Sequence, residues 1–281
     1  SYTFQLYFDF SGYTDMAIGS ALLFNILLPV NFNSPYQATS IQDFWRRWHI
    51  TLSRWLRDYL YIPLGGNRKG ALRTYSNLFL TFLLAGLWHG AGWTFVLWGG
   101  LHGIALVLHR LWKKAGLRMP AIFGWLLTFL FVNAGWVIFR ATTLQQGLEV
   151  LKGMVGINGL VVDAGLKKTL HGVDMMQPYL AKFSGSLVLP GEMYWFLLFF
   201  ALILFLLPNS CRIAGISGRR QQEDIPATPS NLLWRLVIRS REFLLSFRPN
   251  YYWAVLSGIL FSMALYRLLR VEATEFLYFN F

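Results

Sequence analysis

The chain has 281 residues, a formal net charge of +12 and a mean hydropathy of +0.43. Aromatic residues make up 17% of it and charged residues only 14%, which is typical of an integral membrane protein and excludes an ordinary soluble domain. The basic residues cluster between apolar runs, as in the cytoplasmic loops of membrane proteins, so the positive charge does not indicate nucleic-acid binding. The single cysteine, Cys211, excludes an internal disulfide framework and a cysteine-rich metal site.

The first apolar stretch, residues 4–30, carries two acidic residues, Asp9 and Asp15. Ser11, Asp15 and Gly19 are four residues apart, so they share one helix face. A carboxylate in hydrocarbon is costly, and this face is therefore predicted to look toward a neighbouring helix or a cavity. For Asp9 a packing contact is the favoured interpretation, whereas packing and function stay open for Asp15.

A capping-box pattern from Ser40 to Asp43 predicts the start of a second helix, at about 41–60. This helix carries too many charges to span lipid. Basic residues follow one of its faces, and an aromatic and apolar set that includes His49 follows another. Such a helix is predicted to be interfacial or re-entrant, on the cytoplasmic side of the membrane.

The central stretch, residues 78–108, contains no Asp, Glu, Lys or Arg, and its titratable side chains are His89 and His102. It exceeds the roughly 20 apolar residues that a membrane helix needs, and the glycines at 90 and 92 interrupt it. Both flanks are basic, so two membrane-entering helices are predicted to meet at this break. A histidine at a break within hydrocarbon is costly unless it lines a polar cavity, which makes His89 the first functional candidate.

Three further spans are predicted, at 123–139, 193–207 and 251–265. The balanced loop at 140–192 suits the outer side and the basic loop at 212–248 the cytoplasmic side, with the tail at 272–281 outside. The predicted fold class is therefore all-α, a polytopic integral membrane protein. Because the sequence opens inside an apolar segment, we expect the C-terminal part of a longer protein.

The histidines suggest the chemistry. A neutral imidazole is suited to accept a proton from an alcohol as the alcohol attacks a carbonyl. The sequence contains no Gly-x-Ser-x-Gly elbow and no His-Glu-x-x-His zinc pattern, so direct transfer with a histidine base is favoured and no metal site is predicted. His102 is interpreted as an interhelical hydrogen-bonding residue, His109 as interfacial and His171 as solvated.

Four segments carry a specific resemblance: YFDFSGYTDMA at 7–17, DFWRRWHITLS at 43–53, RDYLYIPLGGNR at 57–68 and GLWHGA at 86–91. They resemble the membrane-bound O-acyltransferase (MBOAT) family, and within it the alginate O-acetyltransferase branch, which the closing EFLYFNF also fits. The similarity is close over about 4–110 and in the tail, and only general over 140–250.

The resemblance implies an MBOAT-type helical ring with short re-entrant or interfacial helices, and a central tunnel that joins a cytoplasmic funnel to the periplasm. The chain would be the C-terminal part of one membrane domain, with core motifs in 1–118 and further spans in 119–281. His89 would be the essential histidine, and His49 the second polar site residue, on the funnel side. Candidate residues of the donor funnel or tunnel lining are Arg46, Arg47, Arg54, Trp88 and Asp15. A positive-inside role explains the arginines equally well.

The resemblance also implies an acyl thioester as donor substrate, either acetyl-CoA or a carrier-bound group, and no tightly bound cofactor. The predicted function is histidine-dependent transfer of an acetyl group across the bacterial inner membrane, for O-acetylation of an exported polysaccharide such as alginate. A periplasmic SGNH-type acetyltransferase is the expected partner, through which the polysaccharide is reached, and membrane lipid surrounds the protein.

Three alternatives stay open. One is D-alanyl transfer in teichoic acid modification, where the donor is a carrier protein. Another is a proton-coupled membrane transporter that uses Asp15, His49, His89 and His102 as a relay, although the sequence shows one helix break and no internal repeat. The third is a non-catalytic scaffold for export.

Overall fold

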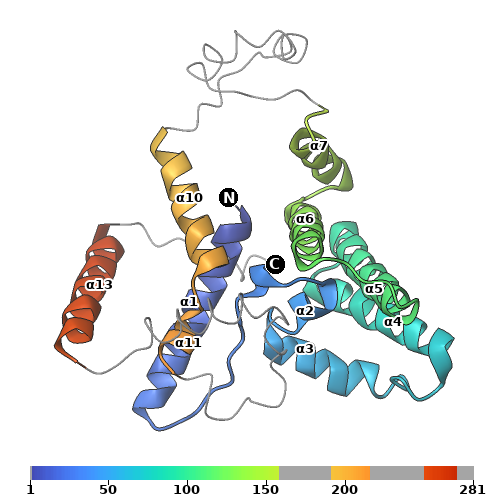
Figure 1. Cartoon of the computed structure of the whole chain (residues 1–281), viewed down its shortest axis with the longest axis horizontal. Coiled ribbons are helices and arrows are strands. Elements are labelled where there is room, and N and C mark those ends of the chain that lie inside the picture. The colour runs from blue at the N-terminus through green and yellow to red at the C-terminus, as the bar shows by residue number, and fades with distance from the viewer. Residues whose placement is uncertain (1, 158–190, 216–249, 271–281) are drawn as a thin grey trace. The chain divides into compact units, whose positions relative to one another are not determined.

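The computed structural model describes residues 2–157, 191–215 and 250–270 (Figure 1). These residues form helices and connecting segments without a β-strand, which confirms the all-α prediction. The chain divides into two compact units. Of the described residues, the first unit contains 39–41, 56–157 and 191–203, and the second contains 2–38, 42–55, 204–215 and 250–270.

Three long helices form the centre of the first unit: α4 (Gly70–His89), α5 (Trp93–Lys114) and α6 (Ala121–Arg140). Helices α4 and α5 run antiparallel and are joined by the short connection at 90–92 (Figure 1). The predicted break in the central apolar stretch is therefore confirmed. Helices α5 and α6 are each long and apolar enough to cross a membrane, by length and composition.

The remaining predicted spans also form helices. Helix α10 (Gly191–Leu206) and helix α13 (Tyr251–Arg270) lie at the predicted positions. Their apolar parts, at 195–206 and 251–266, are shorter than α5 and α6. Part of the predicted outer loop forms the short helix α7 (Leu144–Met154), whose N-cap Thr143 accepts a hydrogen bond from the Gln146 backbone N–H. The tail at 272–281, His171 and most of the loops at 140–192 and 212–248 lie outside the described residues.

The second unit is organised around helix α1 (Tyr2–Leu23) and the segment that follows it, which includes the 3-10 turn Pro35–Gln37. Its core is aromatic, and the rings of six residues meet there at centroid separations of 5.0 to 6.4 Å: Tyr7, Phe10, Phe32, Tyr36, Phe44 and Trp48. Tyr36 also donates a hydrogen bond from its hydroxyl to the Thr3 carbonyl, at 2.9 Å. Offset and edge-to-face ring pairs of this kind stabilise a core beyond the burial of area alone.

The end of α10 and the residues that follow it form hydrogen bonds with the same core. The Asn209 side chain donates to the Phe32 carbonyl at 2.9 Å, and Gln37 donates to the carbonyls of Leu204 and Leu207 at 3.0 and 3.1 Å. The short helix α11 (Ser210–Ile213) follows directly. Residues almost 180 positions apart in sequence therefore share one hydrogen-bonded core.

The predicted continuous helix at 41–60 is wrong. The structure has α2 (Ile41–Trp45), a break at 46–49, α3 (Ile50–Leu56) and then a π-helical turn, Arg57–Tyr61. The break arises because His49 has a φ of 42°, in the left-handed region that L-residues rarely adopt. The backbone of 31–33 holds it there: the Asn33 N–H donates to the Arg47 carbonyl and the Ile50 N–H to the Asn31 carbonyl, each at 3.0 Å. The single aromatic-apolar face that the periodicity predicted through His49 does not exist.

Candidate active site

His89 is the last residue of α4 and lies at the point where the chain leaves the helix. Its imidazole is half-buried against three aromatic rings, each edge-to-face: Trp88 at 5.1 Å, Trp98 of α5 at 5.4 Å and Phe139 of α6 at 5.2 Å between centroids. Three helices of the first unit therefore contribute to the surroundings of this one side chain.

The rings behind His89 also contact each other. Phe139 packs against Phe95, Trp98 and Trp136 at centroid distances of 5.1, 5.1 and 5.7 Å. Trp98, Trp136 and Phe139 are each at most 3% exposed. The rings of Phe95, Trp98, Trp136 and Phe139 thus form an aromatic wall on one side of the half-buried imidazole. A wall of this kind excludes water from one side of a proton acceptor.

His49 has a polar environment within the second unit. Its Nδ1 lies 3.3 Å from the side-chain oxygen of Asn31 and 3.4 Å from the hydroxyl of Thr51. The ring of Phe10, on α1, packs edge-to-face on the imidazole with centroids 4.8 Å apart. His49 and His89 therefore belong to different units and have different kinds of surroundings, one hydrogen-bonded and one aromatic.

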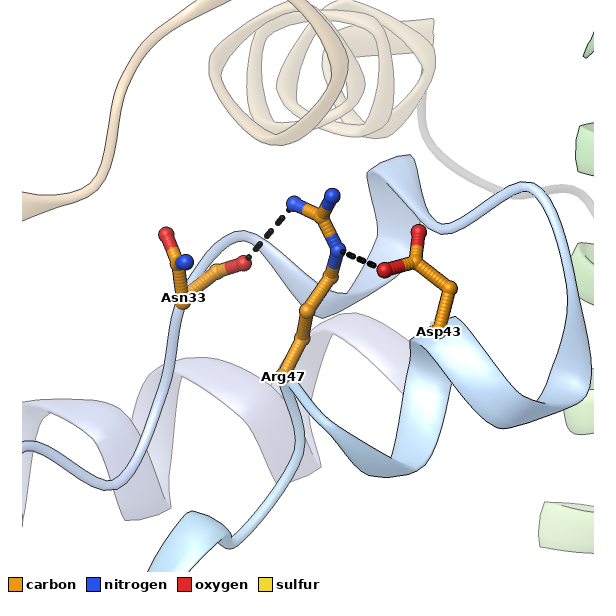
Figure 2. A network of polar contacts seen from close by, with 3 residues as sticks. All are labelled: Asn33, Asp43 and Arg47. Carbon is orange, nitrogen blue, oxygen red and sulfur yellow. Dashed lines mark hydrogen bonds and ion pairs between the residues drawn. The ribbon is translucent and has the colours of Figure 1, made fainter. Parts of the chain in front are cut away.

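The three candidate arginines differ in their burial and in their contacts with other residues. Arg47 forms an ion pair with Asp43, with Nε 2.8 Å from Oδ1, and its Nη1 donates to the Asn33 carbonyl at 3.4 Å (Figure 2). Figure 2 shows the guanidinium lying between these two acceptors. Arg46 is exposed and Arg54 is half-buried. Of the three, Arg47 therefore has an evident structural role, and Arg46 is the one most open to an approaching anion.

Asp15 and Trp88, the other candidates for a lining role, lie in contrasting places. The Asp15 carboxylate accepts hydrogen bonds from the Ser210 hydroxyl and from the Cys211 thiol, the latter at 3.3 Å. This acid therefore contacts the segment after α10, so the prediction that its helix face looks toward a neighbouring part of the chain is confirmed. Trp88 is 64% exposed.

His102 is fully buried in α5. It packs against Trp98 of its own helix, Phe82 of α4 and Phe131 of α6, with centroids 4.8, 6.5 and 5.1 Å apart. Its ring also approaches Gly135 of α6 so closely that a Cβ there would lie 3.1 Å from Nε2. His102 therefore lies between three helices, and its interhelical hydrogen bond stays a prediction.

Within the described ranges no group of three or more His, Cys, Asp or Glu side chains is arranged to hold a metal ion. Sequence reasoning missed several residues of the two histidine environments, namely Asn31, Thr51, Phe95 and Phe139. No local pattern marks them, since Asn31 and Phe139 contact their histidines from other elements, Thr51 lies in the helix that follows His49, and Phe95 packs on Phe139. The signal that the sequence offers is Asn31 itself, a turn-forming residue ten positions before the predicted start of the basic helix at 41.

Helices α5 and α6 are long and apolar enough to cross a membrane, and the candidate histidine lies at the break that precedes α5. Residues 1–145, which include both histidine environments, match the membrane-bound O-acyltransferase family, and the chain belongs to this family.

Among its relatives, the chain is 65% identical over 164 residues to the peptidoglycan O-acetyltransferase of Helicobacter pylori, covering 57% of this chain and 31% of that protein. It is 56% identical over 155 residues to the probable alginate O-acetylase AlgI of Pseudomonas aeruginosa, covering 55% and 30% respectively. The teichoic acid D-alanyltransferase of Bacillus subtilis is more distant, at 35% over 153 residues, covering 49% and 39%. Each alignment spans well under half of the relative's length.

Proposed function

We propose that this chain is part of an enzyme of the bacterial inner membrane, crossing it several times, that transfers an acetyl group from a cytoplasmic thioester to an exported polysaccharide. The donor is acetyl-CoA or a carrier-bound acetyl group. Transfer to the polysaccharide passes through a periplasmic acetyltransferase of the SGNH type.

The observation that carries this proposal is the position of His89, at the end of α4 against the Trp98 and Phe139 rings. A neutral imidazole accepts the proton of an attacking hydroxyl. The hydroxyl oxygen forms a bond to the thioester carbonyl carbon, the carbon–sulfur bond breaks, and the proton passes through His89 to the departing thiolate. No oxidant, metal or further reactant is needed for this reaction, which converts the thioester and the alcohol into an ester and a free thiol.

The relatives support an acetyl group in preference to D-alanine, because the identity to the two acetylating proteins is 65% and 56% against 35% for the D-alanyltransferase. The same comparison favours the glycan of peptidoglycan over alginate as the acceptor. D-alanyl transfer is the second candidate, with a carrier protein as donor.

The test is polymer O-acetylation in cells that carry the full-length protein with His89→Ala or His89→Gln, with protein amounts measured. His109→Ala is the matched control, because His109 lies on α5 outside the aromatic wall. Loss of acetyl groups in the His89 variants, with normal protein amounts and normal polymer export, supports the proposal. Unchanged acetylation overturns the assignment of His89. Joint loss of export and acetylation favours the transporter alternative.

A further inference from the structure

The side-chain oxygen of Asn31 lies close to three polar atoms of Thr51 and His49. Its Oδ1 is 3.3 Å from the Thr51 backbone nitrogen, 2.6 Å from the Thr51 hydroxyl and 3.3 Å from Nδ1 of His49. A backbone N–H is always a donor, so the Asn31 atom that faces it must be the oxygen and not the amide nitrogen. This identifies the group that the imidazole faces.

The orientation of Asn31 bears on the tautomer of His49. A carbonyl oxygen only accepts hydrogen bonds, so a hydrogen bond between it and Nδ1 requires that Nδ1 of the neutral ring carry the proton. The Thr51 hydroxyl gives its own hydrogen to Asn31 at 2.6 Å, which leaves its oxygen to face the same Nδ1–H at 3.4 Å as a second acceptor. The lone pair of the neutral ring is then on Nε2, the nitrogen away from this network.

The backbone supports the same arrangement. His49 precedes α3, and its carbonyl accepts the Ser53 N–H at 3.0 Å, so His49 occupies the N-cap position of that helix. The early N–H groups of a helix have no intrahelical partner, and Asn31 satisfies that of Thr51 from outside the helix. Left-handed backbone at a non-glycine residue persists only where its surroundings fix it, and it is concentrated at functional sites.

We propose that Asn31 and Thr51 are positioning residues that hold His49 as the Nδ1–H tautomer, with Nε2 as the proton-accepting or hydrogen-bond-accepting atom. This inference rests on the proposed function and extends it to His49, which the family resemblance implies is the second polar site residue. It assigns a role to two residues, from two different segments of the second unit, that act through His49.

The first test is independent of activity. In full-length protein labelled with ¹⁵N-histidine and reconstituted in lipid bilayers, solid-state NMR distinguishes protonated from unprotonated ring nitrogens. The His49 signals are those that disappear in His49→Gln. The expected signature is a protonated Nδ1 and an unprotonated Nε2 at a pH where the ring is neutral. The reverse pattern, or an equal mixture, overturns the proposal.

The second test measures acetyl transfer. Asn31→Ala is expected to lower the rate about ten-fold, the lower end of what the outer partners of functional histidines contribute in metal sites. Asn31→Asp keeps an oxygen acceptor and is expected to recover most of the rate. Thr51→Ser keeps the hydroxyl that Thr51→Val removes, so its rate is expected to be higher than that of Thr51→Val. Asn33→Ala is the matched control, because Asn33 contacts Arg47 through its backbone N–H and carbonyl.

The double variants separate positioning from a purely structural role. In a His49→Ala background, Asn31→Ala should lower the rate no further if Asn31 acts through His49. A further ten-fold loss, or a loss of protein amount that Asn31→Asp does not restore, overturns the positioning role. If His49→Ala itself acetylates normally, the role of His49 in the proposed function fails, whereas the NMR signature still decides the tautomer.

Discussion

Gly86 of α4 and Gly99 of α5 face each other with no space for a side chain between them. A Cβ added to either residue would lie 3.0 Å from the Cα of the other. It would also lie 2.3 Å from a backbone carbonyl oxygen, that of Phe95 for Gly86 and that of Phe82 for Gly99. Small residues that allow backbones to approach are the usual means by which helices associate in membranes. This contact fixes where α4 ends relative to α5, and therefore where His89 lies relative to Trp98.

The first prediction follows from this contact. Gly99→Ala should force the two helices apart, since the obstructing atoms are backbone and have no rotamer to change. Overpacking of this kind costs about 1–3 kcal/mol, so the unfolding temperature of the purified full-length protein should fall. Acetyl transfer should fall with it, because the Trp98 ring moves with α5.

The neighbouring Gly100 offers a matched control. A Cβ there would meet only the ends of the Leu83 and Phe79 side chains, at 3.8 and 3.9 Å, which is ordinary van der Waals contact. Gly100→Ala should therefore leave both the unfolding temperature and acetyl transfer close to their original values. Equal effects of the two substitutions would contradict the close helix contact.

The sequence predicted the helix break and the candidate at its edge, because both depend on local composition: a long apolar run, two glycines and one histidine. It did not predict the break at His49, because the periodicity through 41–60 fits a continuous helix. That break is imposed by backbone hydrogen bonds with the Asn31 carbonyl and the Asn33 N–H, and both residues lie outside the periodic window. Likewise, Phe139 contacts His89 only through the packing of α6, 50 residues further along the chain. Long-range contacts of this kind have no local signature.

The second prediction separates Arg46 from Arg47. Arg47→Ala leaves the Asp43 carboxylate without its partner, and both side chains are only 15% exposed. Hydrogen bonds to charged groups contribute about 1.5–3 kcal/mol, so the unfolding temperature should fall. Arg46 is exposed, and Arg46→Ala should change stability by less than about 0.5 kcal/mol.

If Arg46 attracts the phosphates of the donor, Arg46→Ala should instead raise the KM for acetyl-CoA with little change in kcat. Initial rates in inverted membrane vesicles over a range of acetyl-CoA concentrations measure this. A raised KM in Arg47→Ala with an unchanged unfolding temperature would reverse the assignment of the two arginines.

The third prediction concerns pH and Cys211, which lies in α11, beyond the apolar part of α10. Burial, followed by the negative charge of Asp15, raises the pKa of the Cys211 thiol from 9.0 to about 12. Below pH 9 the thiol is protonated in both the folded and unfolded states and contributes no pH dependence. Between pH 9 and 12 the unfolded chain loses this proton while the folded chain retains it, so stability falls as the pH rises.

The measurement is the unfolding temperature of full-length protein from pH 8 to pH 10, compared with Cys211→Ser, whose hydroxyl does not titrate in this range. The original protein should lose roughly 1 kcal/mol more than the variant by pH 10, on the basis of about 1.4 kcal/mol per pH unit. Identical pH dependence in the two proteins would contradict a buried thiol. Slow alkylation of Cys211 in the folded protein and fast alkylation after unfolding should accompany the effect, because the thiolate is the reactive form.

The last prediction places a substitution at the helix break itself. A Cβ on Gly90 would lie 2.6 and 2.7 Å from two atoms of the Phe95 ring, which packs in turn on Phe139, the ring that contacts His89. Gly90→Ala should therefore displace Phe95 and disturb the aromatic wall, and acetyl transfer should fall about ten-fold, since small misplacements of a reacting group have large effects on rate. Adding Phe95→Leu, which removes the obstructing ring atoms, should restore part of the rate, although Phe95→Leu alone lowers it.

Gly92→Ala is the control, because a Cβ there meets its nearest neighbours at 3.5 Å and should change the rate little. If Gly90→Ala is silent, or if Phe95→Leu worsens it further, the aromatic wall does not control the position of His89.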